Sequence, residues 1–379
     1  MYVTNEHEAL RKTIREFAEK EIKPIAQELD EKEEFSVDLT KKMGELGLLG
    51  VVVPEQYGGL GLDYLSYIIC VEELARVDSS QAATIAAHNS LGIGPLLYFG
   101  TEEQKIKYIP QLCTGKSLWS FGLTEPEAGS DSRGSKTKAK LIDGQWIING
   151  SKVFITNASN PLSLGTTVQL VTNNTDGKKE FSTILVEAKT PGFISKKMKK
   201  KLMWRSSDTS EIFFDDCKVP ESNLLGQRGY GSKIMLSTLD NGRLSIAAMG
   251  LGLAQGAYEM ALNYSKHRKQ FGKPISKFQV NAFKLADMAM KIELARNLLY
   301  KTCWLKDNGK PFRKEAAMSK LYCSEIAKQV ADEAVQLHGG YGLIKEYDVE
   351  RFYRDQRLLQ IGEGTSEILR LVISREIGC

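Results

Sequence analysis

Hydrophobic residues recur at helical spacing in the first third of the chain. Between residues 8 and 29 they are separated by three to five positions, with charged residues between them: Leu10, Ile14, Phe17, Ile22, Ile25 and Leu29. This spacing predicts an amphipathic helix. Similar patterns predict helices over 64–77 and 80–98, and the capping-box pair Thr101 and Gln104 predicts one over 102–114. The segment 51–63 contains Pro54 and three glycines, which indicates a loop.

Between residues 117 and 220 the pattern changes to short runs of β-branched and aromatic residues. These runs are LWSFGL, QWIING, KVFIT, TVQLV, STILVE and EIFFDDC. Turn-forming pairs separate them, namely Asp143-Gly144, Asn149-Gly150 and Asp176-Gly177. Short strands at this spacing are typical of a β-sandwich or barrel.

After residue 231 the helical pattern returns and is longer. The segments 232–265, 276–305 and 313–337 are rich in Ala and Leu and contain few helix breakers, which is typical of an antiparallel bundle. The order helical, β, helical is neither a repeat nor β-α-β alternation. We therefore predict an α+β multidomain protein with an α-helical domain at 1–118, a β domain at 119–230 and a helical domain at 231–379.

Composition agrees with a globular protein of this kind. The 379 residues correspond to two or three domains at about 150 residues each. Apolar residues make up 42% and charged residues 26%, which argues against disorder. The 51 basic and 47 acidic residues give a net charge of +4, too balanced for a dedicated nucleic-acid-binding protein but compatible with an anionic ligand.

Cysteine, histidine and hydropathy patterns set further limits. The six cysteines form no C-x-x-C pair, which indicates reduced thiols in a reducing compartment. None of the four histidines has metal-ligand spacing, so we expect no metal site. No apolar run reaches 18 residues, and residues 1–9 lack the apolar core of a signal peptide. We expect a cytoplasmic protein, or a mitochondrial matrix protein if a transit peptide has been removed.

Phe121–Gly134 (FGLTEPEAGSDSRG) leaves a predicted strand with small and hydroxylated residues around Gly129. Such a segment can bring backbone N–H groups close to an anion. It also fits an ordinary glycine-rich loop, and composition alone favours that interpretation. Neither G-x-G-x-x-G nor a P-loop is present, so the common nucleotide motifs are not indicated.

Two further segments offer a similar choice. A long helix stops at Gly339-Gly340, which is either a common C-cap or a close approach to a cofactor or a neighbouring subunit. Arg268 in the string RKQFG could contact a phosphate, although basic residues are favoured at helix C-termini in any case. The basic run 196–201 is interpreted as a solvated face.

Glu363 in QIGEGTSEI lies between Gly362 and Gly364, just before an apolar helical run. Glycine on both sides gives a carboxylate room beside a substrate, and a general base in an apolar cleft needs a raised pKa. The alternative is that Thr365 or Ser366 caps the last helix while Glu363 is solvated. A cap and a base are compatible with each other.

Three of these strings, in this order, resemble the signatures of the acyl-CoA dehydrogenase family. They are FGLTEPEAGSD at 121–131, QLHGGYG at 336–342 with the residues that follow to Asp355, and EGTSEI at 363–368. The order of segments agrees from about residue 5 to residue 376. LDNGR at 239–243 and KPFRKEAAMSKL at 310–321 are most similar to the short-chain, butyryl-CoA branch.

The resemblance implies an all-α N-terminal domain, a central β-barrel or sandwich domain and a C-terminal four-helix bundle. It implies FAD between the β domain and the bundle, an acyl-CoA substrate, electron-transfer flavoprotein as electron acceptor, and a homotetramer. The FAD contacts implied from the β domain are Phe121, Gly122, Leu123, Thr124, Gly129, Ser130, Phe154, Ile155 and Thr156. The contacts implied to FAD of a neighbouring subunit are Arg268, Phe271, Gln279, Gln336, Leu337, His338, Gly339 and Gly340.

Thr365, Ser366 and Glu367 would lie near the adenosine half of FAD, by the same resemblance. The implied acyl-CoA contacts are Ser130, Asp240, Asn241, Gly242, Arg243 and Gly364. Glu363 takes the position of the catalytic base that removes the α proton while the β hydrogen leaves as hydride. Some relatives place the base just before the residue equivalent to Arg243, but Gly242 cannot serve.

Other functions stay open. A cyclic or glutaryl-type acyl-CoA could be the substrate, although residues 84–92 contain no Arg for a distal carboxylate. The chain could also be an acyl-CoA oxidase, although those chains are generally longer. A flavin-free binding protein on the same fold is the alternative from another class, and the retained Glu363 argues against it.

Overall fold

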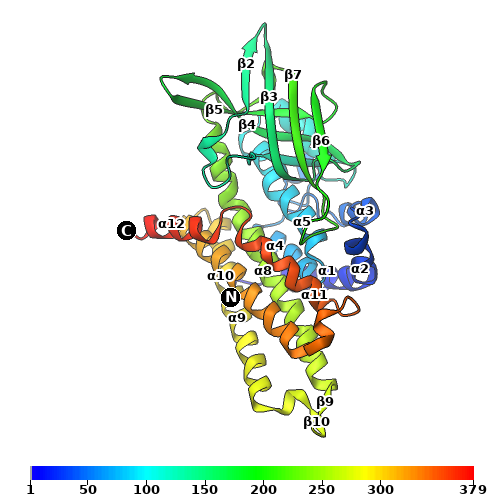
Figure 1. Ribbon diagram of the computed structural model, residues 1–379. Helices are drawn as coiled ribbons and strands as arrows, with labels where there is room; N and C mark the ends of the chain where they lie inside the picture. The colour runs from blue at the N-terminus through cyan, green and yellow to red at the C-terminus, as the bar shows by residue number, and fades with distance from the viewer. Residues whose placement is uncertain (1) are drawn as a thin grey trace.

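The computed structural model describes residues 2–379 and shows a β-sheet at one end of an elongated set of helices (Figure 1). The N-terminal helices precede the sheet in the chain. They are α1 (Asn5–Phe17), α2 (Lys23–Lys32), α3 (Val37–Glu45), α4 (Tyr64–Ala75), α5 (Ser79–Ala87), α6 (Gly94–Phe99) and α7 (Glu102–Leu112). The capping box predicted from Thr101 and Gln104 is confirmed, with both reciprocal hydrogen bonds present.

Two predicted helices contain a π-helical stretch. The predictions of helix over 8–29 and over 80–98 are confirmed, and within these helices the hydrogen bonding is π-helical at Ala18–Ile22 and His88–Ile93. Pro24 and Pro95 follow two residues after these segments. Proline has no N–H to donate to the residue four positions earlier, so the regular hydrogen-bond ladder cannot continue through it.

The central domain is one mixed sheet of eight strands. Its strands are β1 (Leu118–Gly122), β2 (Lys138–Ile142), β3 (Gln145–Thr156), β4 (Ser163–Thr175), β5 (Lys178–Glu187), β6 (Phe193–Lys197), β7 (Thr209–Pro220) and β8 (Leu224–Leu225). The order is β6-β7-β3-β2-β4-β5-β8, and β1 pairs with β4 in parallel. All eight strands are therefore hydrogen-bonded into one sheet.

The turn predictions hold at two of three places. Asp143-Gly144 and Asp176-Gly177 connect β2 to β3 and β4 to β5, and all four residues have positive φ angles, as tight hairpin turns require. The prediction of a turn at Asn149-Gly150 is wrong. This pair lies inside β3, where the register with β7 shifts between Ile148 and Gly150. A glycine is needed there because a Cβ at residue 150 would contact Thr137 at 2.7 Å.

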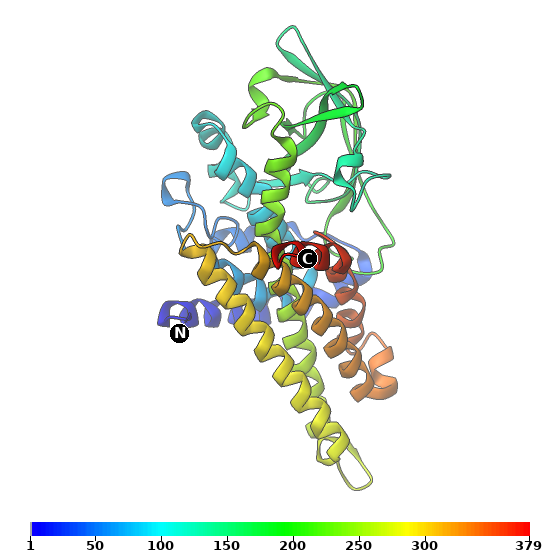
Figure 2. The ribbon, with the colours of Figure 1, turned by 90° about the vertical axis from the view of Figure 1, so that its left-hand side faces the viewer.

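The C-terminal domain contains the three long helices expected from the sequence. They are α8 (Gly231–His267), α9 (Gln279–Asp307) and α10 (Arg313–His338), followed by α11 (Val349–Asp355) and α12 (Ser366–Glu376). Helices α8 and α9 extend away from the sheet to a small hairpin of β9 (Lys269–Gln270) and β10 (Lys273–Pro274) at the opposite end (Figures 1 and 2). The predicted boundary between residues 118 and 119 falls within β1.

The N-terminal and C-terminal helices share one hydrophobic core, whereas the sheet has its own. Helix α8 approaches α4 closely at Gly252 and Gly256, where a Cβ would overlap the carbonyl oxygens of Glu72 and Arg76. The helical parts of the chain are thus packed as a single body, although the β domain, from Leu118 to Leu225, separates them in the sequence.

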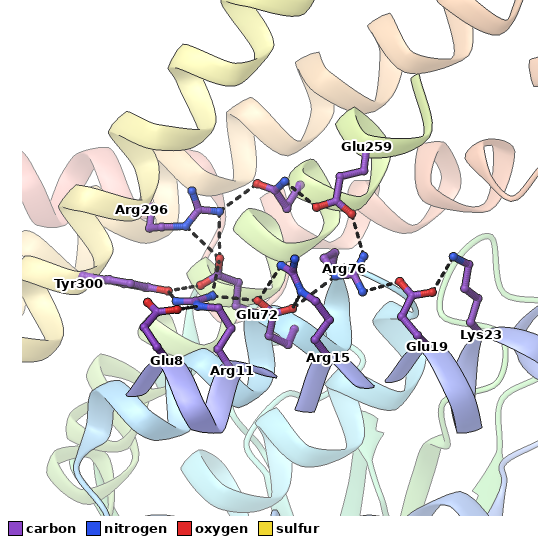
Figure 3. Close-up of polar contacts among 12 residues, drawn as sticks. Glu8, Arg11, Arg15, Glu19, Lys23, Glu72, Arg76, Glu259, Arg296 and Tyr300 are labelled. Carbon is purple, nitrogen blue, oxygen red and sulfur yellow. Dashed lines mark hydrogen bonds and ion pairs between the residues drawn. The ribbon is translucent and has the colours of Figure 1, made fainter. Parts of the chain in front are cut away.

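A buried ionic network also joins these helices, and we call it the Glu72–Glu73 network (Figure 3). Glu72 and Glu73 lie on α4, and their side chains are 2% and 1% exposed. Arg11 and Arg15 of α1 contact Glu73 at 2.9 and 2.8 Å. Glu72 accepts hydrogen bonds from Arg296 at 3.1 Å and from the Tyr300 hydroxyl at 2.5 Å, both on α9.

Arg76 extends the Glu72–Glu73 network in two directions. Its guanidinium contacts Glu19 at 2.5 Å and Glu259 of α8 at 2.7 Å (Figure 3). Each buried carboxylate in the network therefore has a cationic partner, which is the condition under which buried charge is tolerated.

Five of the six cysteines are buried and unpaired, and Cys379 is exposed and also unpaired. Within residues 2–379, no helix combines the length and the hydropathy that crossing a membrane requires.

Candidate active site

Glu363 lies in the loop between α11 and α12, where the backbone takes an unusual conformation. Its φ angle is 54° and that of Gly364 is 105°, both in the left-handed region. A left-handed residue with a side chain is uncommon and often marks a functional site. Thr365 caps α12, with its hydroxyl accepting a hydrogen bond from the N–H of Ile368 at 3.3 Å. Glu363 as a whole is half-buried, and the Oε2 atom of its carboxylate is buried, so this oxygen is not solvated as the alternative supposed.

The carboxylate of Glu363 is also unpaired. Within residues 2–379, its Oε2 atom has no hydrogen-bond partner. Burial raises the pKa of Glu363 to about 7, while the positive charges of Lys320 and Arg243 act in the opposite direction. A carboxylate with a pKa near 7 can accept a proton and release it again at neutral pH, which is what a general base requires.

Helix α8 forms the wall next to this carboxylate. A Cβ at Gly242 would overlap Oε2 of Glu363, so the space that a side chain would fill at residue 242 is taken by the carboxylate. Residues 242 and 363 therefore cannot both carry a carboxylate side chain, because the two side chains would occupy the same space. On α4, the Tyr64 hydroxyl donates to the Asn241 carbonyl at 2.8 Å and closes the same side.

The predicted substrate residues Asp240–Arg243 occupy one turn of α8. Asp240 forms an ion pair with Arg243, which is 5% exposed. Asn241 accepts a hydrogen bond from Lys306 at 2.7 Å. This turn lies against the Glu363 loop, so the structure brings these four residues together with the candidate base. Ser130 is exposed on the loop that follows β1.

A buried ion pair shapes that loop after β1. Glu125 accepts hydrogen bonds from the N–H groups of Lys136 at 2.6 Å and Thr137 at 3.1 Å, and from Lys152 at 2.8 Å. Lys152 also donates to the carbonyl of Leu123 at 3.1 Å. Its side chain is fully buried, and burial lowers its pKa to about 8. The buried ammonium group of Lys152, which lies in the sheet, therefore fixes the position of this loop.

Lys152 lies outside the motifs from which the site residues were predicted. A signal was available, because residues 146, 148, 150 and 152 alternate onto the face of β3 that carries Trp146 and Ile148, both buried. A lysine on the inward face of a strand needs a buried partner.

An open surface lies at the end of β3. The Phe154 ring is 65% exposed on a residue with φ of 60°, and Ile155 beside it is buried. On the loop after β1, a Cβ at Gly129 would contact nothing within 4 Å. An exposed aromatic face of this kind suits a flat ligand. Phe121, Gly122, Leu123, Thr124 and Thr156 lie on the same two segments.

A second group of predicted residues lies at the far end of the bundle. Arg268, Gln336, Leu337, His338, Gly339 and Gly340 line an open cavity of about 470 Å³. The Arg268 guanidinium lies 5.5 Å from the centre of the Tyr341 ring, and Gly339 has φ of 60°. Phe271 is 93% exposed nearby, on the turn between β9 and β10.

The two groups do not meet within one chain. The β9–β10 hairpin and the sheet stand at opposite ends of the molecule (Figure 1). Thr365, Ser366 and Glu367 lie between these ends at the start of α12, where Ser366 donates to Glu325 of α10 at 2.7 Å. A ligand that contacts both groups would have to contact two chains.

Lys320 is a further residue near the site that the sequence analysis did not select. It lies on α10, is fully buried, and donates a hydrogen bond to the carbonyl of Gly364 at 2.6 Å. Its position could be found in the sequence, because Ala316, Lys320, Cys323 and Ala327 recur at helical spacing on one buried face.

Comparison with known proteins finds family models and relatives that match nearly the whole chain. Family models described as the N-terminal, middle and C-terminal domains of acyl-CoA dehydrogenase match residues 4–116, 120–217 and 229–378. A short-chain-specific acyl-CoA dehydrogenase of Clostridium acetobutylicum is 45% identical over 375 residues, covering 99% of this chain and 98% of the relative. A caffeyl-CoA reductase–Etf complex subunit of Acetobacterium woodii is 44% identical, with the same coverage.

Solved structures agree with these matches. Butyryl-CoA dehydrogenase of Megasphaera elsdenii superposes with a TM-score of 0.96 at 43% identity, covering 99% of this chain and 98% of that one. A glutaryl-CoA dehydrogenase of Mycobacterium smegmatis, solved in complex with FADH2, superposes with a TM-score of 0.94 at 30% identity, covering 100% and 95%. The resemblance seen in the three sequence motifs is confirmed, and the chain belongs to the acyl-CoA dehydrogenase family of oxidoreductases.

Proposed function

We propose that this protein is an FAD-dependent dehydrogenase of a short-chain or small branched acyl-CoA, which it converts to the trans-2-enoyl-CoA. The observation that carries the proposal is the Glu363 carboxylate, whose Oε2 atom is buried and unpaired and whose pKa is raised to about 7. In a chain of this family, such a group has the position and the proton affinity for removing the α proton of a thioester.

The residues fit FAD as cofactor. The exposed face of Phe154 and the open position at Gly129 suit a flat ring system with a phosphate-bearing chain. Ser130 and the loop after β1 offer hydroxyl and N–H donors for that chain, and the half-buried Thr156 continues the surface, whereas the Ile155 side chain is buried. When bound, FAD supplies the acceptor for the hydride that leaves the β carbon.

The residues of the chain account for the proton transfer. Glu363 takes the α proton on its carboxylate, and Gly242 leaves the room that this carboxylate needs. Within residues 2–379, the N–H of Glu363 donates to no other backbone or side-chain group, so it is free to stabilise negative charge on the thioester oxygen. Burial of the acyl chain would remove water from the same space and strengthen these interactions.

Two features support a small acyl group. At Gly362 a Cβ would make ordinary van der Waals contacts with the Leu358 side chain at 3.6 Å and its carbonyl oxygen at 3.7 Å, so a side chain could be accommodated at this position next to the base. Short branched acyl groups suit the space that glycine leaves there. Residues 84–92 contain no Lys or Arg to pair with a distal carboxylate, which argues against a glutaryl-type substrate. A cyclic acyl-CoA stays the alternative.

The partners follow from the same comparison. The similarity to a subunit of an Etf complex supports electron-transfer flavoprotein as the electron acceptor. The separation of the two predicted cofactor groups supports an assembly in which Arg268, Gln279 and Gln336–Gly340 of one chain complete the site of another. We propose a homotetramer on this basis.

The proposed function is tested by anaerobic bleaching of the bound flavin. The panel contains acyl-CoAs from C4 to C16, with branched, cyclic and dicarboxylic members. We expect the fastest bleaching with C4 or small branched substrates, and a loss of roughly 10²–10⁴-fold in rate for Glu363→Gln with FAD and ligand still bound. Bleaching of this variant at the wild-type rate contradicts the assignment of the base, and fastest bleaching with long chains contradicts the substrate class.

The assembly is tested separately by size-exclusion chromatography with light scattering. We expect the FAD-loaded protein to be a tetramer, and loss of FAD to weaken it, because a ligand bound only by the assembled form stabilises that form. Arg268→Ala should weaken both FAD binding and assembly. A monomeric FAD-loaded protein with full activity would contradict the shared site.

A further inference from the structure

Two consecutive side chains of α10 and one about a turn earlier hold the Glu363 loop in place. Ser324 donates to the carbonyl of Leu359 at 2.8 Å, and Glu325 accepts from Gln360 at 3.2 Å and from Ser366 at 2.7 Å. Lys320, about one turn before them, donates to Gly364 at 2.6 Å. Hydrogen bonds to α10 therefore lie on both sides of Glu363, while the carboxylate itself has none.

Lys320 differs from the other residues in this attachment because it carries a charge into a buried site. Its side chain is fully buried, and its ammonium contacts the residue directly after the base. A buried lysine is costly unless an anion lies near it. Burial lowers the pKa of Lys320 to about 7, and the carboxylates of Glu363, Glu325 and Glu367 act against this, Glu363 most strongly. Lys320 and Glu363 therefore titrate over the same pH range.

We propose that Lys320 is a positioning residue for the catalytic base: it fixes the left-handed turn at Glu363-Gly364, and its protonated form stabilises the ionised form of the Glu363 carboxylate. The inference rests on the proposed function, since it assigns Lys320 a role through the base of that reaction. Without the hydrogen bond to Gly364, the strained turn loses its attachment nearest to the base. Without the cation, the buried carboxylate loses one of its two opposing positive charges.

The remaining charges around the carboxylate do not replace Lys320. Arg243 of α8 is the other cation that acts on Glu363, but its guanidinium is already paired with Asp240. From α4, Tyr64 and Tyr67 face the site as neutral hydroxyls, because burial raises the pKa of both groups. In its protonated form, Lys320 is thus the second cation that acts on Glu363, and Glu363 is the carboxylate that acts on it most strongly.

The test measures the protonation of Glu363 directly. Infrared difference spectra between the wild type and Glu363→Gln isolate the carboxyl band of Glu363, and a pH titration of that band gives its midpoint without turnover. We expect the midpoint near pH 7 in the wild type and a rise of about one unit or more in Lys320→Met, because removing a nearby opposite charge raises a carboxyl pKa by about 1–3 units. Lys320→Arg should restore the midpoint by keeping the cation.

Kinetics give a second readout. In Lys320→Met we expect the acid limb of the pH profile of kcat to move to higher pH by the same amount, with KM for the acyl-CoA changed less than threefold. Lys201→Met is the matched control, because Lys201 also donates from a largely buried position to two backbone carbonyls, those of Trp204 and Ser207, at 2.8 and 2.6 Å. It should lose stability without any shift of either profile.

The outcomes separate the two proposals. An unchanged Glu363 midpoint in Lys320→Met overturns the role of Lys320, even if the enzyme is active. If no acyl-CoA bleaches the flavin of the wild type, the proposed function fails, while the infrared titration still decides whether Lys320 controls Glu363. If Lys320→Met does not fold, Lys320→Gln replaces it, since it keeps a hydrogen-bond donor and removes the charge, and the same shift is expected.

Discussion

Two acidic regions in the interior of this molecule differ in how their carboxylates are paired. In the Glu72–Glu73 network, every carboxylate has a cationic partner within hydrogen-bonding distance, and the groups come from α1, α4, α8 and α9 (Figure 3). At Glu363, an oxygen of the carboxylate is buried without any partner. The same type of side chain thus serves to hold helices together in one place and stays available for a proton in the other.

The pKa values follow this difference. Salt bridges with Arg15 and Arg11 overcome burial and hold the pKa of Glu73 below its usual range. At Glu363 burial prevails over Lys320 and Arg243 and raises the pKa to about 7. Whether a buried carboxylate is structural or reactive therefore depends on how closely its cations approach it, and burial alone does not decide.

The largest contrast is expected in stability. Glu73→Gln breaks a buried ion-pair set, and removal of one partner of such a pair costs about 3–5 kcal/mol because the other charges stay buried. Glu363→Gln removes an unpaired buried charge and should leave the free energy of unfolding unchanged or increase it. Urea unfolding measures both, and Glu8→Gln is the control on α1, since Glu8 is 59% exposed and contacts Arg11 at 3.5 Å. Equal destabilisation by Glu73→Gln and Glu363→Gln would remove the distinction.

The second contrast concerns geometry at the unpaired carboxylate. In Gly242→Ala the added methyl group overlaps Oε2 of Glu363 and must displace it. We expect kcat to fall about 10²-fold, the typical cost of misplacing a reacting group by about 1 Å. Folding should be little affected, because alanine favours a helix. A wild-type kcat in this variant would mean that the carboxylate does not need the space beside α8.

The third contrast is the sign of the pH dependence of stability. Glu73 has a lowered pKa in the folded protein, so its contribution is present above the ordinary pKa of 4.5 and is lost as the pH falls through the folded value. Glu363 has a raised pKa, so stability falls as the pH rises from about 4.5 to about 7. Glu73→Gln should therefore lower the free energy of unfolding most at neutral pH. The free energy of unfolding of Glu363→Gln should rise relative to that of the wild type as the pH increases from 4.5 to 7. Parallel stability curves for both variants would contradict this assignment.

The smallest effect is expected at Gly362. A side chain fits there beside Leu358, so Gly362→Tyr should fill the space next to Glu363, the proposed base, and favour straight over branched acyl groups. A hydrophobic pocket discriminates by only about 1–3 kcal/mol per methylene, so we expect a changed preference and no exclusion. The measurement is the ratio of bleaching rates for isobutyryl-CoA and butyryl-CoA. If this ratio equals that of the wild type, the space at Gly362 does not determine the preference.

The sequence predicted what depends on neighbours along the chain. The turns at Asp143-Gly144 and Asp176-Gly177, the cap at Thr365 and the three long helices all follow from local spacing and residue type. The π-helical stretch before Pro95 was missed, because an apolar pattern continues through a π segment although the hydrogen bonds change. The prediction of a turn at Asn149-Gly150 was wrong because the same dipeptide is compatible with a turn and with a β-bulge.

What the sequence could not supply are contacts between distant segments. Lys320 and Gly364 are separated by 44 positions, and Glu125 and Lys152 by 27. The partner of a buried lysine is set by the packing of whole elements, so the sequence shows at most that a lysine lies on an apolar face. The clash that fixes Gly242 against Glu363 likewise exists only once α8 and the loop are packed.

The distribution of the cysteines has a practical consequence for counting chains. Burial raises the pKa values of Cys70, Cys113 and Cys217 to about 12, 12 and 11, so these thiols are both inaccessible and protonated. Cys379 at the end of the chain is exposed. A maleimide fluorophore should therefore attach once per native chain, without any substitution. Stepwise photobleaching of single labelled particles then gives the number of chains in each assembly as a number of steps.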